Sequence, residues 1–187
     1  MDGNKTDNAL VVYESIYGNT HAIADAIAEG LRAASVDAAA VPAAQVTGDS
    51  LEGVSLVVAG GPTHAHGMSR PQLRESGAKA AAEAGVDLDP AAEGPWLREW
   101  FDSLGPGRHS GWAASFDTRF DMPELLTGHA SKGILKKLER LGFRKLAEPE
   151  SFLVTRDSHL LPGETERARA WGTALADELL HSEAGKD

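Results

Sequence analysis

The chain has 187 residues, and its 28 Asp and Glu residues outnumber its 18 Lys and Arg residues, which gives a formal net charge of −10. This charge repels a phosphate backbone and argues against a general nucleic-acid binder. The sequence contains no cysteine, which excludes disulfides, thiolate nucleophiles, iron–sulfur clusters and cysteine-ligated zinc. Because 42% of the residues are hydrophobic, we expect one domain with a sizeable core over residues 1–187.

The sequence carries no recognisable targeting or membrane signal. Residues 1–8 are polar and lack the apolar stretch of a secretory signal. No apolar run approaches the roughly 18 to 20 residues that are needed to cross a bilayer. We therefore expect a soluble cytoplasmic protein with no membrane or nucleic-acid partner, and flexible tails at residues 1–8 and 181–187. The oligomeric state stays open.

Short apolar segments predict five strands along the chain. Residues 54–59 are almost continuously apolar, as in a parallel strand that is covered on both faces, and we expect Gly60 and Gly61 to end that strand. Between the strands, apolar residues three or four positions apart indicate helices. Five strands separated by helices predict an α/β fold with a parallel sheet. The expected strands cover residues 9–13, 36–41, 54–59, 112–116 and 151–155.

The predicted helices follow from the same periodicity. Ile23, Ile27 and Leu31 place one helix after the first strand, and Ile134 and Leu138 mark another after the fourth. The remaining helices are expected to begin near Pro71, to cover residues 95–104, and to cover residues 163–180.

The connection between the third and fourth strands is unusually long. Its central part, residues 77–94, is rich in Ala, Gly and acidic residues. One interpretation is a solvated insertion, and the other is a surface that covers a site or binds a partner.

Basic residues recur at every fourth position from Lys132 to Arg144. The spacing predicts that Lys132, Lys136, Arg140 and Arg144 share one helical face. This face is interpreted as the solvated side of an amphipathic helix, with a docking patch for an acidic partner as the alternative.

The segment between the first strand and the first helix has the composition of a phosphate-binding loop. Backbone N–H groups and the positive end of a helix dipole attract anions at such a position. Ser15 and Thr20 add hydroxyl groups, Asn19 adds an amide, and Gly18 lets the backbone come close. The alternative is a turn that only caps the helix. The predicted loop consists of Ser15, Ile16, Tyr17, Gly18, Asn19 and Thr20.

Two common nucleotide-binding motifs are absent from this loop. It has neither the Gly-Lys ending of a P-loop nor the three glycines of a dinucleotide-binding turn. A nucleotide-binding or phosphatase-like α/β protein is therefore poorly supported.

The string V-V-Y-E-S-I-Y-G-N-T-x-x-I-A resembles the start of flavodoxin-like proteins, whose first loop surrounds the phosphate of FMN. The resemblance extends over residues 9–180. It implies a doubly wound, three-layer α/β/α fold with the strand order 2-1-3-4-5 and FMN at the switch point between strands one and three. It also implies a flavoprotein that carries electrons to a redox partner protein or reduces a small acceptor such as a quinone.

The resemblance implies a second flavin loop after the third strand, where the sequence reads G-G-P-T-H-A-H-G. Its backbone and Thr63 are expected near the polar edge of the flavin ring, with His64 or His66 against the ring face. The alternatives are solvent-facing histidines or an H-x-H metal site, which lacks a further ligand at a suitable spacing. The expected contacts are Pro62, Thr63, His64, Ala65, His66 and Gly67.

A third flavin loop is implied after the fourth strand, at Phe116, Asp117, Thr118 and Arg119. The alternative assigns Asp117 and Thr118 to a helix cap and Arg119 to the surface.

The chain departs from the usual pattern in two ways. Tyr17 stands where flavodoxin-like proteins usually have Thr, and the Trp and Tyr that commonly sandwich the ring are missing. These differences leave open a flavodoxin-like domain without flavin that acts as an interaction module.

Overall fold

The computed structural model describes residues 7–64, 67–69, 76, 79, 87–105 and 109–184. The expected start of a helix near Pro71 lies outside this range, as does part of the expected insertion at residues 77–94. Within the described residues, no helix combines the length and apolar character needed to cross a membrane.

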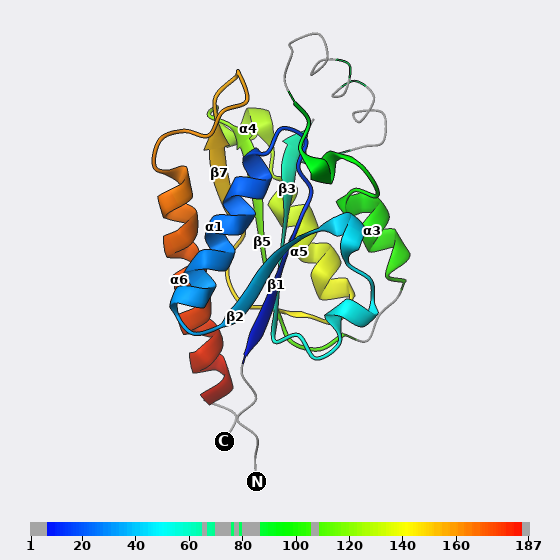
Figure 1. The fold of residues 1–187 in the computed structure, drawn as a ribbon, viewed down its shortest axis with the longest axis vertical. Coiled ribbons are helices and arrows are strands. Elements are labelled where there is room, and N and C mark those ends of the chain that lie inside the picture. The colour runs from blue at the N-terminus through cyan, green and yellow to red at the C-terminus, as the bar shows by residue number, and fades with distance from the viewer. Residues whose placement is uncertain are drawn as a thin grey trace.

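A mostly parallel sheet forms the centre of the molecule (Figure 1). Its strands are β1 (Asn8–Tyr13), β2 (Asp37–Pro42), β3 (Leu56–His64), β4 (Gly67–Met68), β5 (Trp112–Phe120), β6 (Arg144–Lys145) and β7 (Glu150–Val154). β1 pairs in parallel with β2 and β3, and β3 pairs in parallel with β5. β6 and β7 both pair with β5, whereas β4 runs antiparallel to the end of β3. The order β2-β1-β3-β5-β7 confirms the predicted doubly wound arrangement.

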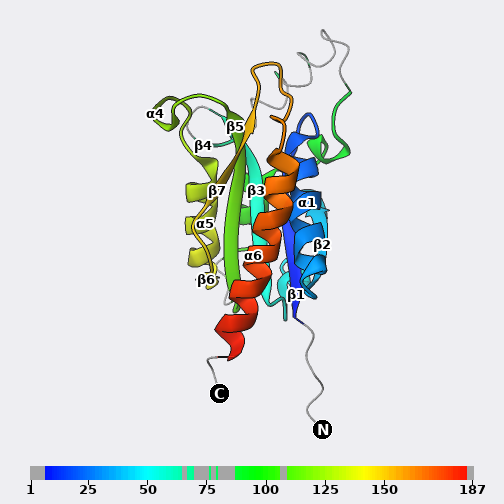
Figure 2. The same ribbon diagram turned by 90° about the vertical axis from the view of Figure 1, so that its left-hand side faces the viewer.

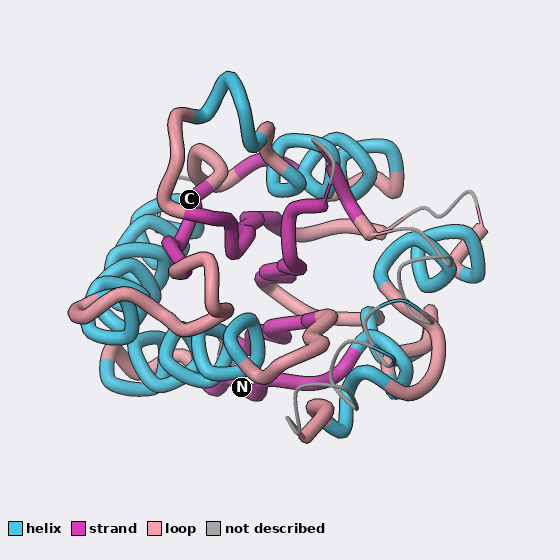
Figure 3. Tube along the Cα trace, turned by 90° about the horizontal axis from the view of Figure 1, so that it is seen from above, coloured by secondary structure: helices cyan, strands magenta, loops and turns pink. Residues whose placement is uncertain are grey.

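Helices cover both faces of the sheet. They are α1 (Asn19–Ala33), α3 (Leu97–Ser103), α4 (Glu124–Thr127), α5 (Ala130–Arg140) and α6 (Glu164–Ala184), with short 3-10 helices η1 (Ala43–Gln45), η2 (Asp49–Leu51) and η3 (Pro90–Ala92). Figure 2 shows α1 and α6 on one face and α5 on the other, and Figure 3 shows the sheet between these layers from above. The predicted three-layer fold is therefore confirmed.

The apolar core divides into two clusters, one on each face of the sheet. Successive residues of a strand point to opposite faces, so Val57 and Val58 of β3 belong to different clusters. The cluster of Val58 includes Ile27 of α1, whereas the cluster of Val57 includes Trp100 of α3 and Leu138 of α5. The continuous apolar character of β3 thus reflects burial on both sides.

Two glycines allow α1 and α6 to pack closely. A Cβ added at Gly30 would collide with the carbonyl oxygen of Arg169, and one added at Gly172 would collide with that of Ile27. Because α1 begins at the predicted phosphate loop, this contact fixes the helix that carries the loop.

The glycine pair does not end the third strand, as the sequence suggested. β3 continues through Gly60 and Gly61 to His64. The ring of Phe116 from β5 occupies the space that a Cβ at Gly60 would need. The glycine therefore serves close packing between neighbouring strands.

The predicted basic face is also shorter than expected. α5 ends at Arg140, Gly142 has a positive φ of 104°, and Arg144 belongs to β6. Arg144 therefore does not share the helical face of Lys132, Lys136 and Arg140, because the chain reverses at the glycine.

Candidate functional site

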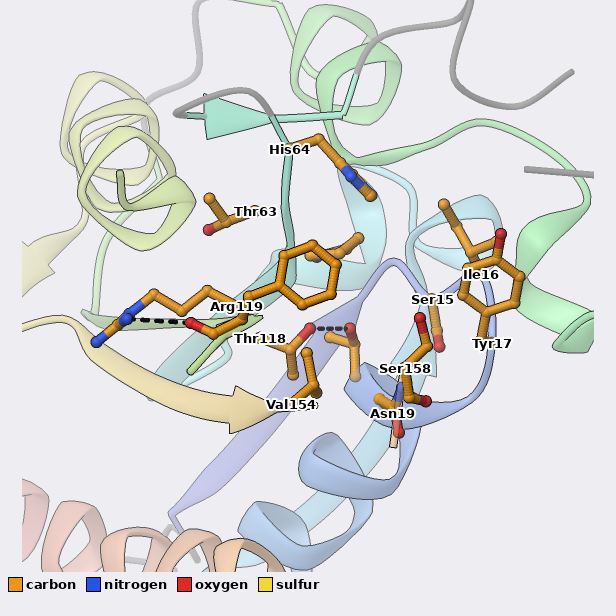
Figure 4. Close-up of a pocket in the computed structure, with 13 residues that line it drawn as sticks. Ser15, Ile16, Tyr17, Asn19, Thr63, His64, Thr118, Arg119, Val154 and Ser158 are labelled. Atoms are coloured by element: carbon orange, nitrogen blue, oxygen red, sulfur yellow. Dashed lines mark hydrogen bonds between the residues drawn. The ribbon is translucent and has the colours of Figure 1, made fainter. Parts of the chain in front are cut away.

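The carboxyl ends of β1, β3 and β5 enclose a narrow cleft of about 60 Å³ together with the end of β7 (Figure 4). This is the edge at which open α/β sheets bind ligands. Phe120, Val154 and Ser158 also line the cleft, and the sequence analysis missed all three. The predicted residues that line it are Ser15, Ile16, Tyr17, Asn19, Thr20, Pro62, Thr63, His64, Thr118 and Arg119.

The loop after β1 leaves the start of α1 open. Gly18 has a positive φ of 86°, and its N–H donates to Ser15 Oγ at 3.0 Å. No side chain of the described residues caps α1, and no acidic residue lies in its first turn. The N–H of Ala22 donates to the Gly18 carbonyl. The N–H groups and positive dipole of the first turn therefore suit an anion.

A loop after β7 closes one side of this region. The amide Nδ2 of Asn19 donates to the carbonyl oxygen of Ser158 at 2.6 Å. Ser158 has a positive φ of 59°, a conformation that is uncommon outside glycine. The amide of Asn19 thus already holds the second loop in place, and Ser158 becomes part of the cleft wall.

Strand alternation separates the polar residues of β5. Thr118 points toward α1, where its hydroxyl lies 2.8 Å from that of Thr20. Asp117 points to the other face, and its Oδ2 accepts the N–H of Ser131 in α5 at 2.8 Å. This bond agrees with the helix-cap alternative for Asp117, whereas Thr118 contacts Thr20 instead. Phe116 is fully buried beside Phe152, so neither Phe116 nor Asp117 lines the cleft.

Thr63 and Arg119 line the cleft but also have partners outside it. Thr63 Oγ1 accepts the N–H of Ala130 at 2.9 Å, beside the contact between Asp117 and α5. The guanidinium of Arg119 donates to the carbonyl of Met122 at 2.9 Å. Figure 4 shows the end of the Arg119 side chain turned away from the labelled residues of the phosphate loop.

His64 lines the cleft and carries a buried nitrogen, Nε2, without a hydrogen-bond partner among the described residues. Burial lowers the pKa of His64, because removal from water disfavours the charged imidazolium. His64 is therefore a neutral imidazole at neutral pH. Ala65 and His66 lie outside the described residues, and Gly67 pairs with His64 between β4 and β3.

Asp89 supports the phosphate loop from outside the cleft. Its N–H donates to the carbonyl of Ile16 at 2.9 Å, and its Oδ2 lies 2.9 Å from Nδ1 of His21. His21 stacks on Tyr13 at 4.6 Å between ring centroids. Burial, together with the negative charges of Asp89 and Asp25, raises the pKa of Tyr13 to about 12. No sequence pattern indicates this contact, because Asp89 lies 68 positions from His21.

Comparisons with known proteins agree with this architecture. The family model described as a flavodoxin domain matches residues 10–75, which include the loop after β1 and the end of β3. A comparison with curated proteins gave no match.

Among solved structures, an archaeal flavodoxin is 21% identical with a TM-score of 0.58, and the alignment covers 93% of this chain and 99% of that one. The flavodoxin of Streptococcus pneumonia TIGR4 is 16% identical with a TM-score of 0.63, covering 94% and 99%. Oxidised flavodoxin 1 of Bacillus cereus is 17% identical with a TM-score of 0.60, covering 94% and 98%. The protein therefore has a flavodoxin-like α/β fold.

Proposed function

We propose that this protein binds FMN in the cleft at the carboxyl edge of the sheet and acts as a redox protein. The observation that carries the proposal is the uncapped start of α1, which opens beside Ser15 at the switch point between β1 and β3. A phosphate monoester at this position receives backbone N–H groups and the positive end of the helix dipole. The match of residues 10–75 to a flavodoxin domain supports the same position.

The remainder of the cleft suits the flavin ring. Ile16, Pro62, Phe120 and Val154 provide apolar surface between the phosphate loop and the end of β3. A buried polar atom normally has a hydrogen-bond partner, and the described residues supply none for Nε2 of His64. A polar group of a bound ligand would be such a partner. The residues present therefore fit a flat, largely apolar ring with a polar edge.

The small size of the cleft implies an exposed ring. Its volume of about 60 Å³ is far below the several hundred Å³ typical of pockets that enclose a cofactor. A cleft of this size would leave part of a bound flavin ring outside it. Bound flavin supplies reversible electron transfer, and the open side gives a redox partner or a small acceptor such as a quinone direct access.

A flavin-free interaction module is the second candidate, and two observations favour it. The carboxylate of Asp89 lies beside the phosphate loop, with Oδ2 3.6 Å from the position of a Cβ at Gly18. The amide of Asn19 already donates a hydrogen bond to the carbonyl oxygen of Ser158. Both reduce the attraction for a phosphate relative to a loop without these contacts.

The visible absorbance of the freshly purified protein, followed by titration of the flavin-free form with FMN, distinguishes the two functions. The proposed function predicts a flavin spectrum, or saturable FMN binding at micromolar concentration or tighter. Absence of both a flavin band and FMN binding would contradict it and leave the interaction module. In the flavin-bound form, oxidation by a quinone after chemical reduction then tests access to the ring.

A further inference from the structure

We propose that His64 is the hydrogen-bond partner of the polar edge of the flavin ring and thereby determines ring affinity. This inference rests on the proposed function, since it concerns the same cleft. It differs from the expectation drawn from the sequence, in which Thr63 served the ring edge and His64 packed against the ring face.

The first step is the position of His64 relative to the phosphate end. Ser15, Asn19 and Ser158 lie together at one end of the cleft, whereas His64 extends from the end of β3 on its other side (Figure 4). A ligand whose phosphate lies at the start of α1 therefore directs the rest of its structure toward β3. His64 would then contact the ring, and a polar edge of the ring would supply a partner for its unpartnered nitrogen.

Second, two other polar side chains in the lining of the cleft have hydrogen-bond partners outside it. The hydroxyl of Thr63 accepts the N–H of Ala130 at 2.9 Å, and this bond helps to close the start of α5. The guanidinium of Arg119 is held by the carbonyl of Met122. The end of the Arg119 side chain also turns away from the labelled residues of the phosphate loop (Figure 4). His64 Nε2 is buried without a partner among the described residues.

The third step concerns the charge of the imidazole. None of the described residues that line the cleft is acidic, so no carboxylate there favours the imidazolium. Burial lowers the pKa of His64 and keeps the ring neutral. A neutral imidazole nitrogen either donates or accepts, depending on the tautomer. The flavin edge carries both carbonyl oxygens and an N–H, so it can satisfy either form.

In the flavin-free protein, a buried nitrogen without a partner lowers the free energy of unfolding. In the flavin-bound protein, the same nitrogen gains a hydrogen bond and increases the affinity for the flavin. Replacement of His64 by an apolar residue should therefore change stability and affinity in opposite directions. A residue with a purely structural role would lower both quantities together.

The test compares His64→Leu and His64→Gln with the wild type, and uses His181→Leu as the control, since His181 is exposed near the end of α6. FMN and riboflavin are titrated against the flavin-free proteins, and thermal unfolding of the same proteins is recorded. We expect His64→Leu to weaken the binding of FMN and of riboflavin by the same factor of about ten, because His64 would not contact the phosphate. The same variant should unfold at a temperature equal to or above that of the wild type. His64→Gln should recover part of the affinity, and His181→Leu should change neither quantity.

The outcomes separate this inference from the proposed function. Wild-type protein that binds neither flavin overturns both. Wild-type binding that His64→Leu leaves unchanged overturns only the role of His64. Loss of affinity accompanied by an equal loss of thermal stability also overturns it, because His64 would then support the fold. A loss confined to FMN would place His64 at the phosphate rather than at the ring.

Discussion

Two helices begin at the carboxyl edge of the sheet, and their first turns differ. α5 is closed by side chains from neighbouring strands, since Thr63 accepts the N–H of Ala130 and Asp117 accepts that of Ser131. Among the described residues, no side chain caps α1 and no acidic residue lies in its first turn, although the carboxylate of Asp89 lies beside Gly18. Both helices have the same backbone dipole, so the capping side chains decide which end remains available to an anion. Thr63 of β3 and Asp117 of β5 thus occupy the start of α5, which leaves the start of α1 as the proposed anion site.

The largest expected effect comes from making α1 resemble α5. Ser15→Asp places a carboxylate beside the open first turn, where it competes with the flavin phosphate and repels it. We expect FMN affinity to fall about 100-fold, which corresponds to about 3 kcal/mol, whereas riboflavin affinity changes little. Ser15→Ala is the matched control and should lower the affinity for FMN less than Ser15→Asp does. Equal losses for FMN and riboflavin would place the damage in the fold or the ring site.

The second prediction opens the closed helix. Asp117→Ala removes the fully buried carboxylate that accepts the N–H of Ser131. The unfolding free energy should fall by about 2 kcal/mol, because a buried donor loses its partner. Urea denaturation measures the change, and Asp121→Ala, at an exposed position just beyond β5, should cost less than about 0.5 kcal/mol. Similar losses in both variants would show that the bond to α5 has no special importance.

The third prediction concerns the contact that joins the two regions. Thr118→Val leaves the buried hydroxyl of Thr20 without its partner. We expect a loss of about 1 kcal/mol in the unfolding free energy. The double variant with Thr20→Val should lose less than the sum of the single variants, since no hydroxyl then remains unpaired. Strict additivity in this cycle argues that the two hydroxyls do not interact.

The smallest expected effect is the pH dependence contributed by His64. Burial lowers the pKa of this residue in the folded protein, so below about pH 6.5 the unfolded chain binds a proton that the folded chain does not. The stability from the neutral imidazole is thus fully present above that pH and decreases as the pH falls toward the lowered value. Urea denaturation of the flavin-free protein between about pH 5 and 7 should therefore show a shallower pH dependence for His64→Gln than for the wild type. An identical pH dependence of the unfolding free energy in the two proteins would show that His64 makes no such contribution.

Apolar periodicity in the sequence predicted the strands and most helices, whereas the strand order was implied by the resemblance to flavodoxin-like proteins. The three predicted loops also identified ten residues that line the cleft. The hydrogen-bond partners of the site residues could not be predicted, because these partners come from other parts of the chain. Examples are Ser131 for Asp117 and Ser158 for Asn19. Asp89 and Ser158 were missed for the same reason, as both reach the phosphate loop from distant parts of the chain.

The central claim is that the start of α1 binds the phosphate of FMN. Calorimetric titration of the flavin-free wild type with FMN and with riboflavin tests it most directly, since the two ligands differ only in the phosphate. The account predicts that FMN binds at least about tenfold tighter than riboflavin and that inorganic phosphate narrows the difference. Equal dissociation constants for the two flavins, or a difference insensitive to phosphate, would contradict it.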